Sequence, residues 1–388
     1  MKNSLIALAA FGACTAPALA AGGNVQLYGV IDLGVTHFTG LSNGAGGKAS
    51  MTALSSGVQS PSVIGLKGVE PLGGGMAAIF DIETGFCAAG TNQDMKAGSA
   101  TPLSGGFCTG GGFMQSRSWA AIKGRWGAIA AGRDYTRMYK NEVRFDPFGA
   151  GTTGAYTNLS IISQYGLSRL SQGLVYISPT EHGLDGSLSY SFAPSGSAVP
   201  AGLPSGSNVS RSLGANASYS AGPLDLGVAF AEVTNLRLRA MLNPTSGVND
   251  GTLSGWQVGA AYDFGMVKLS ALYEQSKADY NSGSAKSMML GARVPLGSGA
   301  VLASFGEART DYGMRNINLL GTAMYGTAKQ YAIGYTYALS KRTNLYASYA
   351  RISNDAMTNF AVESATDVLG GVMGQNSSGM AVGMRHAF

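Results

Sequence analysis

The sequence lacks long hydrophobic runs beyond its first twenty residues. No later stretch reaches the ~18 consecutive apolar residues that a membrane-spanning helix needs. Charge is also scarce, because only 12% of the 388 residues are charged whereas 45% are hydrophobic. Apolar residues that are frequent but interleaved with polar ones predict strands with one face in lipid and the other in water, as in a transmembrane β-barrel. A soluble, glycine-rich β-sandwich or fibre is the alternative.

Histidines and nucleophile motifs are few as well. Only His37, His182 and His386 are present, and no G-x-S-x-G motif accompanies His37, the one histidine outside a predicted turn or lipid-facing position. The net charge of +5 is not clustered as nucleic-acid binding requires. We therefore expect no catalytic residue, no cofactor, no metal site and no nucleic-acid partner.

The N-terminus has the form of a secretory signal peptide. Lys2 precedes the apolar stretch "LIALAAFGAC", and Ala18-Leu19-Ala20 fits the small-residue cleavage pattern. We expect cleavage after Ala20, which leaves 21–388 as a single domain. A lipoprotein with Cys14 as the lipid-carrying residue is the alternative, although the residues before Cys14 form a poor lipobox.

The rest of the chain alternates between strands and turns. In 331–339 large residues alternate with small ones, and in the last strand Met380, Val382 and Met384 alternate with Ala381 and Gly383. Seven short turns rich in Gly, Pro or Asp join seven hairpins, and longer segments such as 39–59, 88–112 and 135–171 separate them. The first strand, from Asn24, and the last, ending at Phe388, can pair and close the cylinder. The pattern predicts an all-β, antiparallel transmembrane barrel of about 16 strands, with the longer segments as external loops.

Several segments resemble the Gram-negative general porins, in particular the betaproteobacterial and neisserial type. They are "NVQLYGVIDLGV", "GLKGVEPLGGGMAAIFDIETGF", "GLVYISPTEHGLDGSLSYSF", "YALSKRTNLYASYARISN" and "VGMRHAF". The resemblance implies a homotrimer of 16-stranded barrels in the outer membrane, surrounded by outer-membrane lipids and lipopolysaccharide. It also implies that the third external loop folds into each pore, and that the barrel-assembly machinery recognises the C-terminal strand with its final Phe388.

Charged side chains on the strands are expected to face the channel, because a charge facing lipid is costly. Alternation places Lys67 inward on the second strand, and Asp81 and Glu83 inward on the third. Alternation does not decide Arg117 and Arg133, which share parity with apolar neighbours. The cost of exposure to lipid and the resemblance assign both inward.

The 135–171 segment is the longest predicted loop. Its "FDPFGAG" resembles the acidic tip at the porin constriction, and on that resemblance Glu142 and Asp146 are candidate acidic groups. They would face a basic wall formed by Lys67, Arg117, Arg133 and Arg169. Opposed rows of charge at a water-filled constriction orient polar solutes, and the excess sign sets the ion preference. A solvated position at a loop or rim is the alternative for each residue.

Two cysteines remain after signal cleavage. Cys87 and Cys108 bracket one predicted loop, and in an oxidising periplasm such a pair favours a disulfide over two free thiols.

The functional hypothesis is a passive general diffusion channel for small hydrophilic solutes and ions, with a modest anion preference. A solute-selective channel, for instance for phosphate or organic anions, and a plugged structural or adhesive barrel are the alternatives.

Overall fold

The structure is a computed structural model that describes residues 24–43, 47–89, 116–164, 168–192, 211–234, 252–278, 283–311, 325–363 and 370–388. The expected signal peptide and Cys108 lie outside the described residues. The elements are β1 (Asn24–Ser42), β2 (Lys48–Ser56), β3 (Val63–Gly73), β4 (Met76–Gly85), β5 (Arg117–Gly124), β6 (Gly127–Tyr135), α1 (Arg137–Phe145), η2 (Tyr156–Asn158), α2 (Ile161–Gln164), β7 (Arg169–Ile177), β8 (Leu184–Ser191), β9 (Arg211–Ala221), β10 (Leu224–Thr234), β11 (Leu253–Asp263), β12 (Lys268–Ala278), β13 (Gly283–Leu296), β14 (Gly299–Thr310), β15 (Gly326–Ala338), β16 (Thr343–Asn354) and β17 (Ser377–Ala387).

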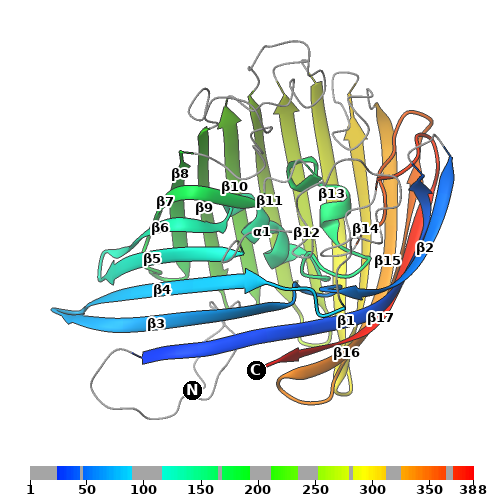
Figure 1. Ribbon diagram of the computed structural model, residues 1–388. Coiled ribbons are helices and arrows are strands. Elements are labelled where there is room, and N and C mark those ends of the chain that lie inside the picture. The colour runs from blue at the N-terminus through cyan, green and yellow to red at the C-terminus, as the bar shows by residue number, and fades with distance from the viewer. Residues whose placement is uncertain are drawn as a thin grey trace, which may run out of the picture.

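The strands form one closed antiparallel barrel (Figure 1). Strand β1 pairs with β17 along ten residues, from Val30 opposite Ala387 to Thr39 opposite Ser378, and this pairing closes the cylinder. The predicted closure by the first and last strands is confirmed. Closure removes the sheet edge, which an isolated sheet in lipid would have to leave unpaired.

The described residues contain 17 strands, yet the barrel has the predicted 16 positions around its wall. Strand β1 pairs with β2 along 33–42 and with β3 along 24–30, so β2 and β3 occupy one position in succession. The prediction that 39–59 forms an external loop is wrong for β2. Its alternating residues are small or polar, as in "KASMTALSS", so the lipid-facing signal is weak.

Alternation of burial separates the two faces of the wall. On β15, Tyr331 and Ile333 are exposed, whereas Ala332 between them is buried. On β17, Met380 and Val382 are exposed on either side of the buried Ala381. Large apolar residues therefore cover the outside, and small residues line the inside, as the sequence predicts.

Phe388 ends the chain against the first strand. Its backbone N–H donates to the carbonyl oxygen of Gly29 at 3.0 Å, and the N–H of Gly29 donates to the Phe388 oxygen at 3.1 Å. The phenyl ring covers Gly29, where an added Cβ would lie 2.3 Å from the ring. The last residue is thus part of the closing seam.

Candidate functional site

Residues 136–164, here called the crossing segment, follow β6 and lie against the inner wall. Helix α1 begins after Thr136, whose hydroxyl accepts a hydrogen bond from the N–H of Tyr139, and it packs on β9 to β12. Further hydrogen bonds follow around the wall, from Asn141 to Gln257 (β11), from Tyr156 to Ser287 (β13), from Asn158 to Gln330 (β15) and from Thr153 to Ser348 (β16). The buried wall residues in these pairs lie on the inner face, opposite the exposed apolar residues. Figure 1 shows α1 within the ring of strands.

Glycines on the inner face allow this close approach. An added Cβ at Gly259 would lie 2.1 Å from the Phe145 ring, and one at Gly291 would lie 2.7 Å from Pro147. Phe145 itself is almost fully buried. The crossing segment is therefore packed on the wall by large residues that sit over glycines.

Glu142 is buried between α1 and the wall. Its Oε1 accepts hydrogen bonds from Ser160 Oγ at 2.6 Å and from Gln257 Nε2 at 2.8 Å, and its Oε2 accepts one from Ser163 Oγ at 2.6 Å. Burial and the neighbouring charge of Glu274 hold the pKa of Glu142 well above its usual range. The expectation that Glu142 faces the channel is wrong, because the acid lies on the helix face that packs on β11 and β12.

Asp146 stabilises the turn that follows α1. Its carboxylate accepts the backbone N–H groups of Phe148 at 2.9 Å, Ala150 at 3.0 Å and Tyr156 at 2.9 Å. Burial raises the pKa of Asp146 to about 6, although these three N–H groups favour its charged form. Asp146 is only 5% exposed, so it serves as a loop cap rather than as an open acidic group.

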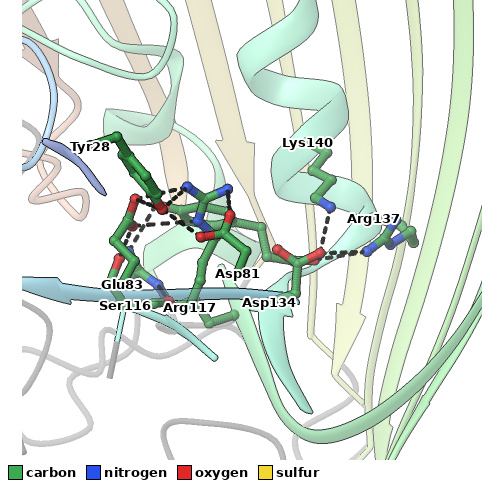
Figure 2. Close-up of polar contacts among 10 residues, drawn as sticks. Tyr28, Asp81, Glu83, Ser116, Arg117, Asp134, Arg137 and Lys140 are labelled. Atoms are coloured by element: carbon green, nitrogen blue, oxygen red, sulfur yellow. Dashed lines mark hydrogen bonds and ion pairs between the residues drawn. The ribbon is translucent and has the colours of Figure 1, made fainter. Parts of the chain in front are cut away.

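Arg117 lies on the inner face of β5 within an acidic pair (Figure 2). Its Nη1 is 3.2 Å from Asp81 Oδ2, and its Nη2 is 2.7 Å from Glu83 Oε2. Tyr28 Oη donates to Asp81 Oδ1 at 2.5 Å, and Lys67 Nζ lies 5.3 Å from the centre of the Tyr28 ring. The predicted inward residues of β3, β4 and β5 meet here. Two cations and two carboxylates balance, so this group is not the predicted basic wall.

The start of the crossing segment adds a second ionic group, also shown in Figure 2. Asp134 Oδ2 is 3.2 Å from Arg137 Nη2 and 2.5 Å from Lys140 Nζ. Arg137 is buried, while the Lys140 side chain is 43% exposed. Two cations surround one carboxylate, which leaves one positive charge in excess. Arg137 and Lys140 were not among the residues predicted from the sequence, although both belong to the helix that follows the inward-facing Asp134.

Residues 5–357 match a family model that is described as Gram-negative porin. The chain belongs to the Gram-negative porin family. It is 30% identical to an outer membrane porin protein of Bordetella pertussis, over all of both chains. This porin also resembles the solved anion-selective porin from Comamonas acidovorans, with a TM-score of 0.72, 24% identity, and coverage of 94% of this chain and 100% of the other. A trimer form of the outer membrane protein OmpT of Vibrio cholerae gives a TM-score of 0.64 at 12% identity, covering 95% of this chain and 100% of the other. The family places this porin in the outer membrane as a passive channel.

Arg133 lies beside an irregularity of the wall. It pairs across the strands with Ser118, and the register between β6 and β7 shifts between Gly132 and Asp134, so alternation from Ile129 does not fix the side on which Arg133 lies. Its guanidinium donates to Ser171 Oγ and is partly covered. A place for Arg133 in a channel-facing basic wall stays a prediction.

Arg169 lies at the start of β7, beside the entry to the crossing segment. Its guanidinium carbon is 4.6 Å from the centre of the Tyr135 ring, and its Nε donates to the Ser116 carbonyl oxygen at 3.1 Å. A contribution of Arg169 to ion preference stays a prediction.

Arg293 is a further inward-facing cation, which was not among the residues predicted for the constriction. It lies between the crossing segment and the short turns. Arg293 shares its face of β13 with Gly291, over which Pro147 packs, and its side chain is exposed. It lines a cavity of ≈430 Å³ together with Gln59, Asp146 and Asn344. Arg293 thus follows the crossing segment on the path toward the short turns.

Cys87 is disulfide-bonded. Cys108 lies outside the described residues, so its pairing with Cys87 stays a prediction.

Proposed function

We propose that this porin is a general diffusion channel that passes small hydrophilic solutes and ions, with a modest preference for anions. The observation that carries the proposal is the uneven burial of charge on the crossing segment. Its acids Glu142 and Asp146 are 0% and 5% exposed, whereas Lys140 is 43% exposed. An anion that passes the segment meets the cation and not the carboxylates.

The size of the preference follows from the local balance. The Arg117 group is neutral, the Asp134 group has one excess cation, and Arg293 adds an exposed cation below. Low-dielectric walls focus such a field, but a hydrated pore with both signs present discriminates weakly. We infer that the preference comes from Lys140 and Arg293 more than from Lys67 and Arg117, whose charges are balanced by Asp81 and Glu83.

The wider setting is part of the same proposal. The chain is made with a signal peptide, residues 1–20, and 21–388 forms one barrel domain without catalytic activity. It works as a homotrimer, which the likeness to a trimeric outer membrane barrel supports. The barrel-assembly machinery recognises its C-terminal strand, and lipopolysaccharide surrounds the barrel.

Single-channel recording in a planar bilayer tests the proposal. A general pore gives a large conductance that is linear with voltage and insensitive to small organic anions. Block by phosphate or an organic anion would instead indicate a solute-selective channel. No conductance from folded protein would indicate a plugged barrel.

A further inference from the structure

The wall of the barrel is interrupted between β2 and β3. Strand β1 pairs with β2 down to Leu33 and with β3 from Val30 onward. Residues 57–62, here called the inner segment, thus face only two residues of β1, so most of them cannot lie in the plane of the sheet. They turn inward, because Val58 is 0% exposed and belongs to one buried cluster with Ala381, a residue of the inner face.

Asp32 on β1 holds the inner segment in this position. Its side chain is 0% exposed, and its Oδ2 accepts the backbone N–H groups of Gln59 at 2.8 Å and Ser60 at 2.7 Å. Its Oδ1 accepts the hydroxyl of Tyr346 at 2.7 Å. Arg385 Nε also donates to Ser60 Oγ at 2.7 Å. A buried carboxylate is stable only where hydrogen bonds replace its water, and the inner segment supplies two of these three.

The inner segment meets the crossing segment near the middle of the latter. The Thr152 N–H donates to the Val58 carbonyl oxygen at 2.7 Å. Gly151 comes so close that an added Cβ would lie 1.9 Å from the Gln59 carbonyl oxygen. The two segments therefore meet backbone to backbone, and we call this contact the joint.

Together the two segments form one layer on the inner face of the wall. The crossing segment bonds to β11, β13, β15 and β16, and the inner segment continues from β16 through β17 to β1. Asn344 of β16 donates to Gln59 Oε1 at 2.8 Å beside the joint. The channel is bordered by this layer and by the inner residues of β3 to β5, where Lys67 and Arg117 lie. Movement of the joint would change the width between them.

We propose that Asp32 is a positioning residue for the constriction, because it holds the inner segment and, through it, the middle of the crossing segment. That middle lies farthest along the chain from both ends of the crossing segment, so it depends most on noncovalent contacts. The effect on solute passage rests on the proposed function, whereas the contacts can be tested without it. The opposing possibility is an irregularity of the wall that has no effect on the channel.

Asp32→Asn tests the positioning role in planar bilayers. The amide brings N–H groups into a site whose hydrogen-bond partners are all donors, so at least one hydrogen bond to a charged group is lost. We expect the open channel to show more current noise and to admit larger neutral polymers than the native channel does. The matched control is Asp263→Asn, which removes a carboxylate that accepts the Gly265 N–H at 2.8 Å in a short turn.

A thiol at position 58 reports on the joint without any conduction. Val58 is buried, and Cys87 is disulfide-bonded and does not react, so a water-soluble maleimide should modify the folded Val58→Cys protein slowly. Loss of a hydrogen bond to a charged group raises the population of locally open states, so adding Asp32→Asn should speed the labelling about tenfold. Adding Asp263→Asn instead should leave the rate unchanged.

Gly151→Ala loosens the joint from the other side and leaves the hydrogen bonds of Asp32 in place. The added methyl group does not fit 1.9 Å from the Gln59 oxygen, so we expect the same faster labelling and the same added noise. This variant decides the matter where Asp32→Asn does not fold. Its control is Gly186→Ala on β8, where an added Cβ would lie 3.1 Å from the nearest atom.

Slow labelling of position 58 in both the Asp32→Asn and the Gly151→Ala proteins would overturn the proposal. Fast labelling with the noise and polymer limit of the native channel would overturn it too, because the inner segment would then not position the constriction. A native protein without conductance would contradict the proposed function, whereas the labelling rates would still decide whether Asp32 holds the joint.

Discussion

Glu142 and Glu274 lie on either side of one serine hydroxyl. Ser160 Oγ is 2.6 Å from Glu142 Oε1 and 2.8 Å from Glu274 Oε2, and Gln257 Nε2 bridges the same two oxygens at 2.8 and 2.9 Å. The hydroxyl has one hydrogen, so it can donate to only one carboxylate. The other short contact requires a proton on a carboxyl group. The two acids therefore share one proton, and the shared proton joins the crossing segment to β12.

Loss of that proton should loosen α1 from the wall. The folded pKa of Glu142 is raised, so the stabilisation is complete below its ordinary pKa and is lost as pH rises through the raised value, about 8. We expect amide hydrogen exchange in 137–145, corrected for the intrinsic effect of pH, to be faster at pH 9 than at pH 6.

A neutral partner provides the control for this pH effect. Glu274→Gln keeps the shape of the side chain and removes the charge that opposes Glu142, so its exchange should depend much less on pH. Equal protection of 137–145 at both pH values in the native protein would contradict the shared proton.

Removal of Arg117 should lower the stability of the folded barrel and have a smaller effect on ion selectivity. Arg117→Ala leaves Asp81 and Glu83 buried beside each other, and breaking such a pair costs about 3–5 kcal/mol. Urea unfolding, followed by the shift between folded and unfolded bands on unheated gels, measures the loss. Lys123→Ala, which removes an exposed cation from the same strand, should change stability by less than about 0.5 kcal/mol. Similar stability of the Arg117→Ala and Lys123→Ala proteins would show that the acids are not held by the guanidinium.

The disulfide of Cys87 gives a direct chemical test. We expect no free thiol in the denatured, unreduced mature protein, and we expect Cys108→Ser to expose one thiol at Cys87. Two labelled cysteines in the unsubstituted protein would refute the Cys87–Cys108 bridge.

Deletion of Phe388 should reduce the amount of folded protein in the outer membrane rather than the conductance of each channel. The deletion removes both backbone hydrogen bonds to Gly29 and the ring that covers it. Quantitative blotting of outer-membrane fractions, with single-channel recording of whatever folds, separates the two effects. Normal amounts of folded protein from the chain that lacks Phe388 would show that Phe388 is not needed for assembly.

The strands could be predicted from the sequence because their information is local. The period of two on β15 and β17 shows in consecutive residues, and it decided which side faces lipid. The burial of Glu142 could not be predicted in this way. Its partner Glu274 lies on a strand far along the chain, and an acid on a loop helix has the same pattern whether it faces water or a wall. The hydrogen bond from Arg133 to Ser171 could not be predicted either, because only the folded sheet brings the two residues together.

The zero-current potential in a salt gradient tests the central claim most directly, with native protein and the Lys140→Gln, Arg293→Gln double variant in planar bilayers. The native channel should show a modest anion preference, and the double variant should move toward cation preference, while Lys341→Gln in a short turn should leave the potential unchanged because exposed charges beyond about 8 Å are screened at physiological salt. A native channel that prefers cations, or a double variant with the native potential, would contradict the account.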